Sequence, residues 1–189
     1  LTLSIPDSQD DNGTPIISMN SVTEDGIITL KGIRKIKLPK SGRINYLEKG
    51  DLLFNWRNGS KHLVGKTGYF EFDGKYVFAS FLLGIRAKPE YLDSRYLWHL
   101  LNDYRKAGKY MNFMRQNVNG LFNRDELTIV KIPLPPLETQ REIVARIETE
   151  RVIVHGNREL IRGYEEKVEK VIAGGWGGWS LGACETVHV

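Results

Sequence analysis

Two polar segments of this 189-residue sequence contain the side chains that most often bind nucleic-acid bases and phosphates. Arg and Lys bind guanine or phosphate, whereas Asn and Gln can pair with adenine. Both segments lie between expected regular elements, where binding residues are common, so we treat them as candidate DNA contacts. The candidates are Asn55, Arg57, Asn58, Ser60, Lys61 and His62 in NWRNGSKH, and Arg115, Gln116, Asn117, Asn119, Asn123 and Arg124 in RQNVNGLFNR.

The same residues have a simpler interpretation as turn and capping residues. Asn58-Gly59 and Asn119-Gly120 are typical of turns, and Asn123 is suited to capping a short helix. Trp56 is the large apolar member of the first segment, and we expect it to pack rather than to read a base. For each polar residue the binding and the turn interpretations both stay open.

The basic residues are concentrated in one part of the chain. Residues 1–30 contain five acids and no Lys or Arg, whereas residues 31–66 contain ten Lys or Arg against Glu48 and Asp51. A surface that binds a polyanion needs such an excess, because each neutralised phosphate releases counterions. Arg43 and Lys66 therefore join the candidate DNA contacts. The alternative is a solvated face of strands and turns.

A catalytic alternative depends on Asp51, Asp73 and Lys75, which follow the acid, gap, acid-x-Lys order of many metal-dependent nucleases. Two carboxylates there hold Mg²⁺, and the lysine stabilises the developing charge. Asp73-Gly74 is equally explained as a turn. The four histidines are scattered, with no cysteine or acid at metal-ligand spacing, so we expect no metal site. No Gly-rich loop leads from a strand into a helix, so we expect no bound cofactor either.

The pattern of apolar residues predicts an α+β protein, with a mixed, mainly antiparallel sheet domain before a long C-terminal coiled-coil-type helix. Asp73-Gly74 predicts a tight hairpin between aromatic strands. A helix begins after Asp93 or Ser94, and Gly108 divides it from a second short helix at 110–115. The expected strands are residues 15–18, 27–30, 33–38, 51–55, 67–72, 76–83 and 127–132.

Residues 137–173 predict one uninterrupted helix after the prolines of IPLPPLETQ. Apolar residues recur every seven positions, which is typical of a coiled coil, and the helix would be roughly 55 Å long. Such a stripe needs a partner. The residues expected at this partner-binding seam are Ile143, Ile147, Val154, Ile161, Tyr164 and Val168.

The organisation along the chain therefore comprises three parts. Residues 1–136 form the expected recognition domain, residues 137–173 the helix, and residues 174–189 a Gly- and Trp-rich tail of uncertain origin. The single cysteine forms no internal disulfide, no apolar run is long enough to span a membrane, and the N-terminus lacks a signal pattern. We expect a cytoplasmic protein.

Three segments resemble the target recognition domain and spacer helix of the specificity subunit of type I restriction-modification enzymes. They are DLLFNWRNGSKHLVGKTGYF, YVFASFLLGIRAKPEYL and IPLPPLETQREIVARIE, and together the resemblance covers about residues 14–173. It implies sequence-specific recognition of a bipartite site in double-stranded DNA by a subunit that is not itself catalytic.

The resemblance also implies partners. These are methyltransferase (modification) subunits, which use S-adenosylmethionine, and a restriction subunit, which uses ATP. We expect those cofactors and Mg²⁺ in the partners. The family usually has two recognition domains and two spacer helices, so this chain is expected to be a half-subunit or a fragment that pairs through its helix with a second copy or a second half-subunit. A coiled-coil scaffold that does not bind DNA is the remaining alternative.

Overall fold

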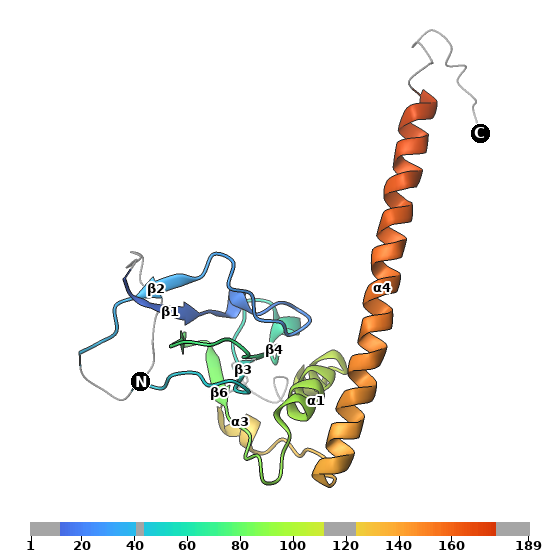
Figure 1. Cartoon of the computed structure of the whole chain (residues 1–189). Coiled ribbons are helices and arrows are strands. Elements are labelled where there is room, and N and C mark those ends of the chain that lie inside the picture. The colour runs from blue at the N-terminus through green and yellow to red at the C-terminus, as the bar shows by residue number, and fades with distance from the viewer. Residues whose placement is uncertain (1–11, 41–43, 112–123, 177–189) are drawn as a thin grey trace. The chain divides into compact units, whose positions relative to one another are not determined.

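The computed structural model describes residues 12–40, 44–111 and 124–176 (Figure 1). The chain divides into two compact units, Leu1–Val144 and Ala145–Val189. In the described residues the first unit contains two small sheets, helices α1 and α3 and the first turns of α4, and the second unit contains the rest of α4. The predicted class, a mixed and mainly antiparallel α+β domain followed by a long helix, is confirmed.

Strand β3, Leu52–Asn55, is the central strand of the first sheet. Strands β4, Thr67–Tyr69, and β6, Leu82–Ile85, pair with it on either side, both antiparallel. All four residues of β3 are buried, as a continuous apolar run predicts. Side chains alternate along a strand, so Phe54 contributes to one core cluster and Leu53 to another. The strand therefore separates two cores.

The second sheet has strand β1, Thr14–Ile17, at its centre. Strand β2, Arg34–Ile36, pairs with β1 antiparallel, and β5, Val77–Phe78, pairs with it parallel. Ile17 of β1 packs in the same cluster as Leu53 of β3. This shared cluster joins the two sheets into one domain.

Helix α1, Ser94–Lys106, covers the first core. Its N-terminus is capped by Asp93, whose carboxylate accepts hydrogen bonds at 2.9 Å from the backbone N–H groups of Arg95 and Tyr96. These two hydrogen bonds confirm the predicted cap. The predicted break is also confirmed, because α1 ends at Lys106 and Gly108 has a φ of 70°. The apolar face of α1 packs beside β3 through Leu97, Trp98, Leu101 and Tyr104.

The predicted hairpin at Asp73-Gly74 is wrong. Gly74 does have a positive φ of 117°, but β4 and β5 on either side of it belong to different sheets. The aromatic rings that suggested two paired strands pack on one another instead, and they fill the core between the sheets. These rings belong to Phe70, Phe72 and Tyr76.

Three expected strands also differ from the structure. Residues 76–83 form two strands in two sheets, separated by a turn in which Leu82 N–H donates to the Ala79 carbonyl at 3.0 Å. Residues 27–30 form only isolated bridges, at Ile27 and Ile28. The strand expected at 127–132 begins within helix α3, Arg124–Thr128, and continues as a loop. The short 3₁₀ helices η1, Met19–Ser21, and η2, Lys61–Leu63, complete the unit.

A buried amide holds the start of α4 in the first unit. Gln140 is fully buried, and its Oε1 accepts from Asp93 N–H at 2.8 Å. Its Nε2 donates to the carbonyls of Tyr91 at 2.9 Å and Pro135 at 2.7 Å. Tyr96 adds a hydrogen bond from its hydroxyl to the Pro133 carbonyl at 3.1 Å. The proline segment and the first turn of α4 are thus tied to the start of α1.

Helix α4, Leu137–Trp176, has 40 residues and is about 60 Å long, drawn in orange to red in Figure 1. Val154, Ile161, Tyr164 and Val168 are between 47% and 65% exposed, and Ile147 is partly buried. In proteins a helix gains most of its stability from packing of its apolar face, so this exposed stripe is suited to packing against a partner. None of the helices in the described part of the chain is both long and apolar enough to cross a membrane.

Replacing Gln140 by alanine tests the importance of this amide. The change leaves Asp93 N–H and the carbonyls of Tyr91 and Pro135 without their partner in a buried place, so we expect Gln140→Ala to lower the free energy of unfolding by about 2 to 3 kcal/mol. Urea unfolding measures the change. Thr139→Ala, at the exposed neighbouring position, is the control, and an equal effect of both variants contradicts the assignment.

Candidate nucleic-acid interface

The loop between β3 and β4 has a rigid base. Asn55 N–H donates to the Lys66 carbonyl at 2.9 Å, and Gly65 N–H donates to the Asn55 carbonyl at 2.8 Å. Gly65 has a φ of 86°, and a Cβ at this position would lie 2.2 Å from the ring of Tyr110. Only glycine fits here. The two hydrogen bonds and the packed ring fix where the loop leaves the sheet.

Four of the candidate DNA contacts extend from this loop into solvent. Arg57, Ser60, Lys61 and His62 are exposed, in or beside η2. Asn58 is partly buried, and its Oδ1 accepts from Ser60 N–H at 3.1 Å, which is the turn role that the sequence left open for it. The exposed side chains lie close together in the chain, and Arg and Lys among them provide positive charge for a polyanion.

Two of the predicted DNA contacts from the same region, Asn55 and Lys66, are buried. Asn55 is fully buried, and its amide has no hydrogen-bond partner among the described residues. Lys66 is 6% exposed, and its Nζ donates to the Met19 carbonyl at 3.1 Å. Burial, and then the charge of Arg105, lowers the pKa of Lys66. In this conformation neither side chain can reach DNA.

The other candidates are not tested by the structure. Arg124 is the first residue of α3. Six of the predicted contacts lie outside the described residues: Arg43, Arg115, Gln116, Asn117, Asn119 and Asn123.

The six positions outside the described residues stay predictions, because the structure places none of their side chains. The interface can therefore be built only from the loop that follows β3 and from the elements that contact it.

One aromatic residue beside the loop was missed by the sequence analysis. Phe81 lies in the turn before β6 and is 39% exposed, and the guanidinium of Arg57 lies 5.6 Å from the centre of its ring. Residues 76–83 were expected to form one strand, which concealed this turn. The signal that could have found it is Ala79-Ser80, two small residues that interrupt the apolar run.

Asp51 and Asp73, the two carboxylates of the nuclease interpretation, form ion pairs with different cations. Asp51 accepts from Arg86 at 2.7 Å through both oxygens, and Glu48 accepts from the same guanidinium at 2.7 Å. The hydrogen bonds that Arg86 donates to Asp51 raise the pKa of Arg86. Asp73 pairs with Lys49 at 2.9 Å. In the described residues no group of three or more His, Cys, Asp or Glu side chains is arranged to hold a metal.

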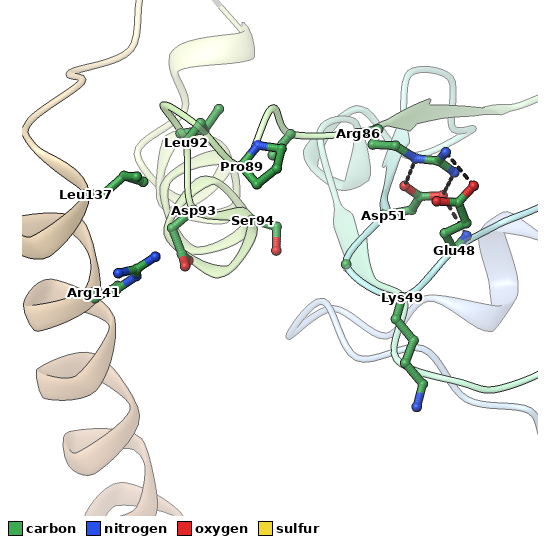
Figure 2. Close-up of a pocket in the computed structure, with 12 residues that line it drawn as sticks. Glu48, Lys49, Asp51, Arg86, Pro89, Leu92, Asp93, Ser94, Leu137 and Arg141 are labelled. Carbon is green, nitrogen blue, oxygen red and sulfur yellow. Dashed lines mark hydrogen bonds and ion pairs between the residues drawn. The ribbon is translucent and has the colours of Figure 1, made fainter.

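The Asp51–Arg86 ion pair lies in a cleft of about 310 Å³ within the first unit. Figure 2 shows Arg86 directed at Asp51 and Glu48, with Leu137 and Arg141 of α4 lining the other part of the cleft. The pair follows from the register of the sheet, because Leu52 lies opposite Ile85 and the two charged residues come next to them in the chain. This geometry makes the pair a support for β3 and β6.

Residues 3–152 match the family described as the type I restriction modification DNA specificity domain. The chain belongs to this family. The match includes β3, the loop after it, α1 and the proline junction, so it confirms the resemblance that the sequence showed in the same segments.

Known proteins are similar to this chain in sequence and in fold. The putative type I restriction enzyme MjaX specificity subunit of Methanocaldococcus jannaschii is 28% identical over 145 residues, which are 75% of this chain and 34% of that protein. The crystal structure of the HsdS subunit from Thermoanaerobacter tengcongensis is similar with a TM-score of 0.66 at 21% identity, over 97% of this chain and 49% of that one.

A second solved structure is similar with a TM-score of 0.71 at 20% identity, over 92% of this chain and 45% of the other. It comes from work on complex assembly and conformational transition of the type I R-M system. This chain therefore spans about half of the solved structures and about a third of the curated relative that it matches.

The buried lysine of this specificity-domain chain predicts a pH-dependent stability. The pKa of Lys66 is lower in the folded chain than its ordinary value of 10.5, so between these two values the unfolded chain binds more protons. Stability should therefore rise with pH across that window. Lys66→Met has no such group, so the free energy of unfolding of the parent minus that of the variant should increase as the pH rises toward 10.5.

Urea unfolding of both proteins across this pH range measures the difference. Lys61→Met, which removes an exposed lysine from the same loop, controls for the loss of a lysine charge. A parent-minus-variant difference for Lys66→Met that stays constant or decreases as the pH rises would show that Lys66 is not held as the structure describes.

Proposed function

We propose that this chain recognises a specific sequence in double-stranded DNA as the specificity subunit, or a half of one, of a type I restriction-modification system. The observation that carries the proposal is the family match over residues 3–152. The exposed loop with Arg57 and Lys61 supports it, because its side chains are of the types that contact DNA bases and phosphates.

Exposed basic residues outside the loop supply the sequence-independent part of the binding. They lie just before and just after β2, an edge strand of the second sheet. Contacts with phosphates position a protein on the duplex and make its affinity depend on salt. The residues proposed for this role are Lys31, Lys37 and Lys40.

The catalytic steps belong to partners in this proposal. The methyltransferase subunits would use S-adenosylmethionine and the restriction subunit ATP and Mg²⁺, while this chain binds none of them and places the partners on the target. The support is the family match and the similar protein of Methanocaldococcus jannaschii, which is called a putative specificity subunit. DNA of the cell is the substrate, so the chain would act in the cytoplasm.

The exposed stripe of α4 is the proposed contact with a second recognition module. Apolar residues at heptad positions stay exposed in the single chain, and the relatives are about twice as long or longer, so the occupant is an equivalent helix. It would come from a second copy or from a second half-subunit. Helices of about 60 Å could hold two modules one to two turns of DNA apart, since a turn is ~34 Å.

Selection from a pool of random duplexes tests the DNA-binding proposal. The full chain is mixed with the pool at physiological salt in the presence of Mg²⁺, and the bound duplexes are sequenced. We expect enrichment of two short inverted half-sites at a fixed spacing, because two identical modules related by a twofold axis read inverted sequences. Affinity for the selected duplex should fall as salt rises.

Other outcomes of this selection contradict the proposal in different ways. Salt-dependent binding with no enriched motif would indicate a nucleic-acid-binding protein that does not read sequence. A chain that binds no duplex would favour the coiled-coil scaffold. Cleaved ends in the sequenced pool would reopen the nuclease interpretation of Asp51, Asp73 and Lys75.

Charges in the stripe of α4 test the helix partner. Ile147→Asp, Val154→Asp and Ile161→Asp, made together, place three carboxylates in the seam, so we expect loss of self-association, measured by sedimentation equilibrium. The control adds the same charge at exposed heptad positions away from the seam, through Thr149→Asp, Val152→Asp and Gly156→Asp. Equal association states for parent, seam variant and control would disprove the seam.

A further inference from the structure

Two turns that are distant in the sequence are held together at the exposed end of the first sheet. Trp56 N–H donates to the Phe81 carbonyl at 3.3 Å, and the indole Nε1–H of Trp56 donates to the Ser80 carbonyl at 3.0 Å. The rings of Trp56 and Phe81 lie 6.4 Å apart. The turn that carries Phe81 is therefore fixed to the loop that carries Arg57.

Arg57 and Phe81 form an exposed pair on this support. The guanidinium lies 5.6 Å from the centre of the Phe81 ring, within the range of a cation–π contact. Among the described residues no carboxylate lies within ion-pair distance of Arg57. A cation–π contact with the ring restricts the guanidinium while its N–H donors stay available, so less conformational freedom is lost when Arg57 binds a ligand.

The exposed Phe81 ring adds an apolar surface beside these donors. The Phe81 ring is 39% exposed, unlike a core residue, and Lys61 and His62, on the same loop as Arg57, are also exposed. In the major groove of DNA, a guanine presents two acceptors to arginine, and a thymine presents a methyl group to an apolar side chain. Donors and ring side by side match a guanine next to a thymine.

We propose that Arg57 and Phe81 determine part of the target sequence, with Arg57 binding the N7 and O6 atoms of a guanine and Phe81 contacting the methyl group of a neighbouring thymine. This inference depends on the proposed DNA recognition and deepens it, because it names the residues and the base pairs. Phe81 also acts as a positioning residue for Arg57, since its ring orients the guanidinium.

Modified bases in the selected duplex test both contacts separately. Each guanine is replaced in turn by 7-deazaguanine, which lacks the N7 acceptor, and each thymine by deoxyuridine, which lacks the methyl group. For the parent chain we expect about a tenfold loss of affinity at one guanine. At a neighbouring thymine we expect about a fourfold loss, the value for one buried methyl group.

The variants show whether these losses pass through the two residues. Arg57→Ala should become insensitive to 7-deazaguanine at that position, and Phe81→Ala should become insensitive to deoxyuridine at its neighbour. Phe81→Leu keeps an apolar side chain but loses the ring, so it should weaken the preference for guanine. This variant also decides the matter if Phe81→Ala fails to fold, which thermal unfolding would reveal.

A second exposed pair of a ring and a cation provides the control. Lys75 Nζ lies 5.8 Å from the centre of the Tyr46 ring, which is 37% exposed. Tyr46→Ala should leave the selected motif unchanged. Loss of the same base preferences in Tyr46→Ala would show that the effects of the Phe81 variants are not specific to the pair.

The failures of the two proposals are distinguishable. If the parent chain selects no motif, the proposed function fails and this inference with it. If the parent selects a motif that Arg57→Ala and Phe81→Ala read with unchanged preferences, only the inference fails. Arg57→Ala could instead lose the same affinity on every duplex and bind with a smaller dependence on salt. That result would assign Arg57 to a phosphate and overturn its role in reading guanine.

Discussion

The burial of strand β3 on both faces is the constraint on which the rest of the first unit depends. Leu53 and Phe54 enter two different cores, so the second sheet must pack against one face of the strand and α1 against the other. A polar residue lies at each end of the strand. Asp51, directly before β3, binds Arg86, and the buried Asn55 is the last residue of β3. The loop that carries the candidate DNA contacts therefore begins directly at a rigid core.

Local signals predicted the elements whose structure depends on nearby residues. The apolar run of β3, the Asp93 cap of α1 and the long proline-free α4 were all readable from the sequence, because each depends on residues within a few turns or positions. The division of residues 76–83 between two sheets was not readable. Periodicity shows that a segment is apolar and extended, but it does not show which partner strand each half will find.

The candidate site shows the same limit for single side chains. The sequence identified a polar loop and its basic residues, and Arg57 and Lys61 of this loop are exposed. Residue type did not reveal that Asn55 and Lys66 are buried, because their burial is decided by how the strands pack. Phe81 was invisible for a related reason: it meets Arg57 only because β6 pairs with β3.

The hydrogen bonds that join the proline segment and α4 to α1 are separate from the loop that carries the candidate DNA contacts. Prolines cannot donate a backbone hydrogen bond, so the segment is held through its carbonyls, and a buried glutamine and Tyr96 supply the donors. The residues of this junction come from the start of α1 and the start of α4, and none of them belongs to the loop of Arg57 or the turn of Phe81. Under the proposed DNA recognition, a change of side chains in that loop and turn would alter the bases that are read while every hydrogen bond of the junction stays in place.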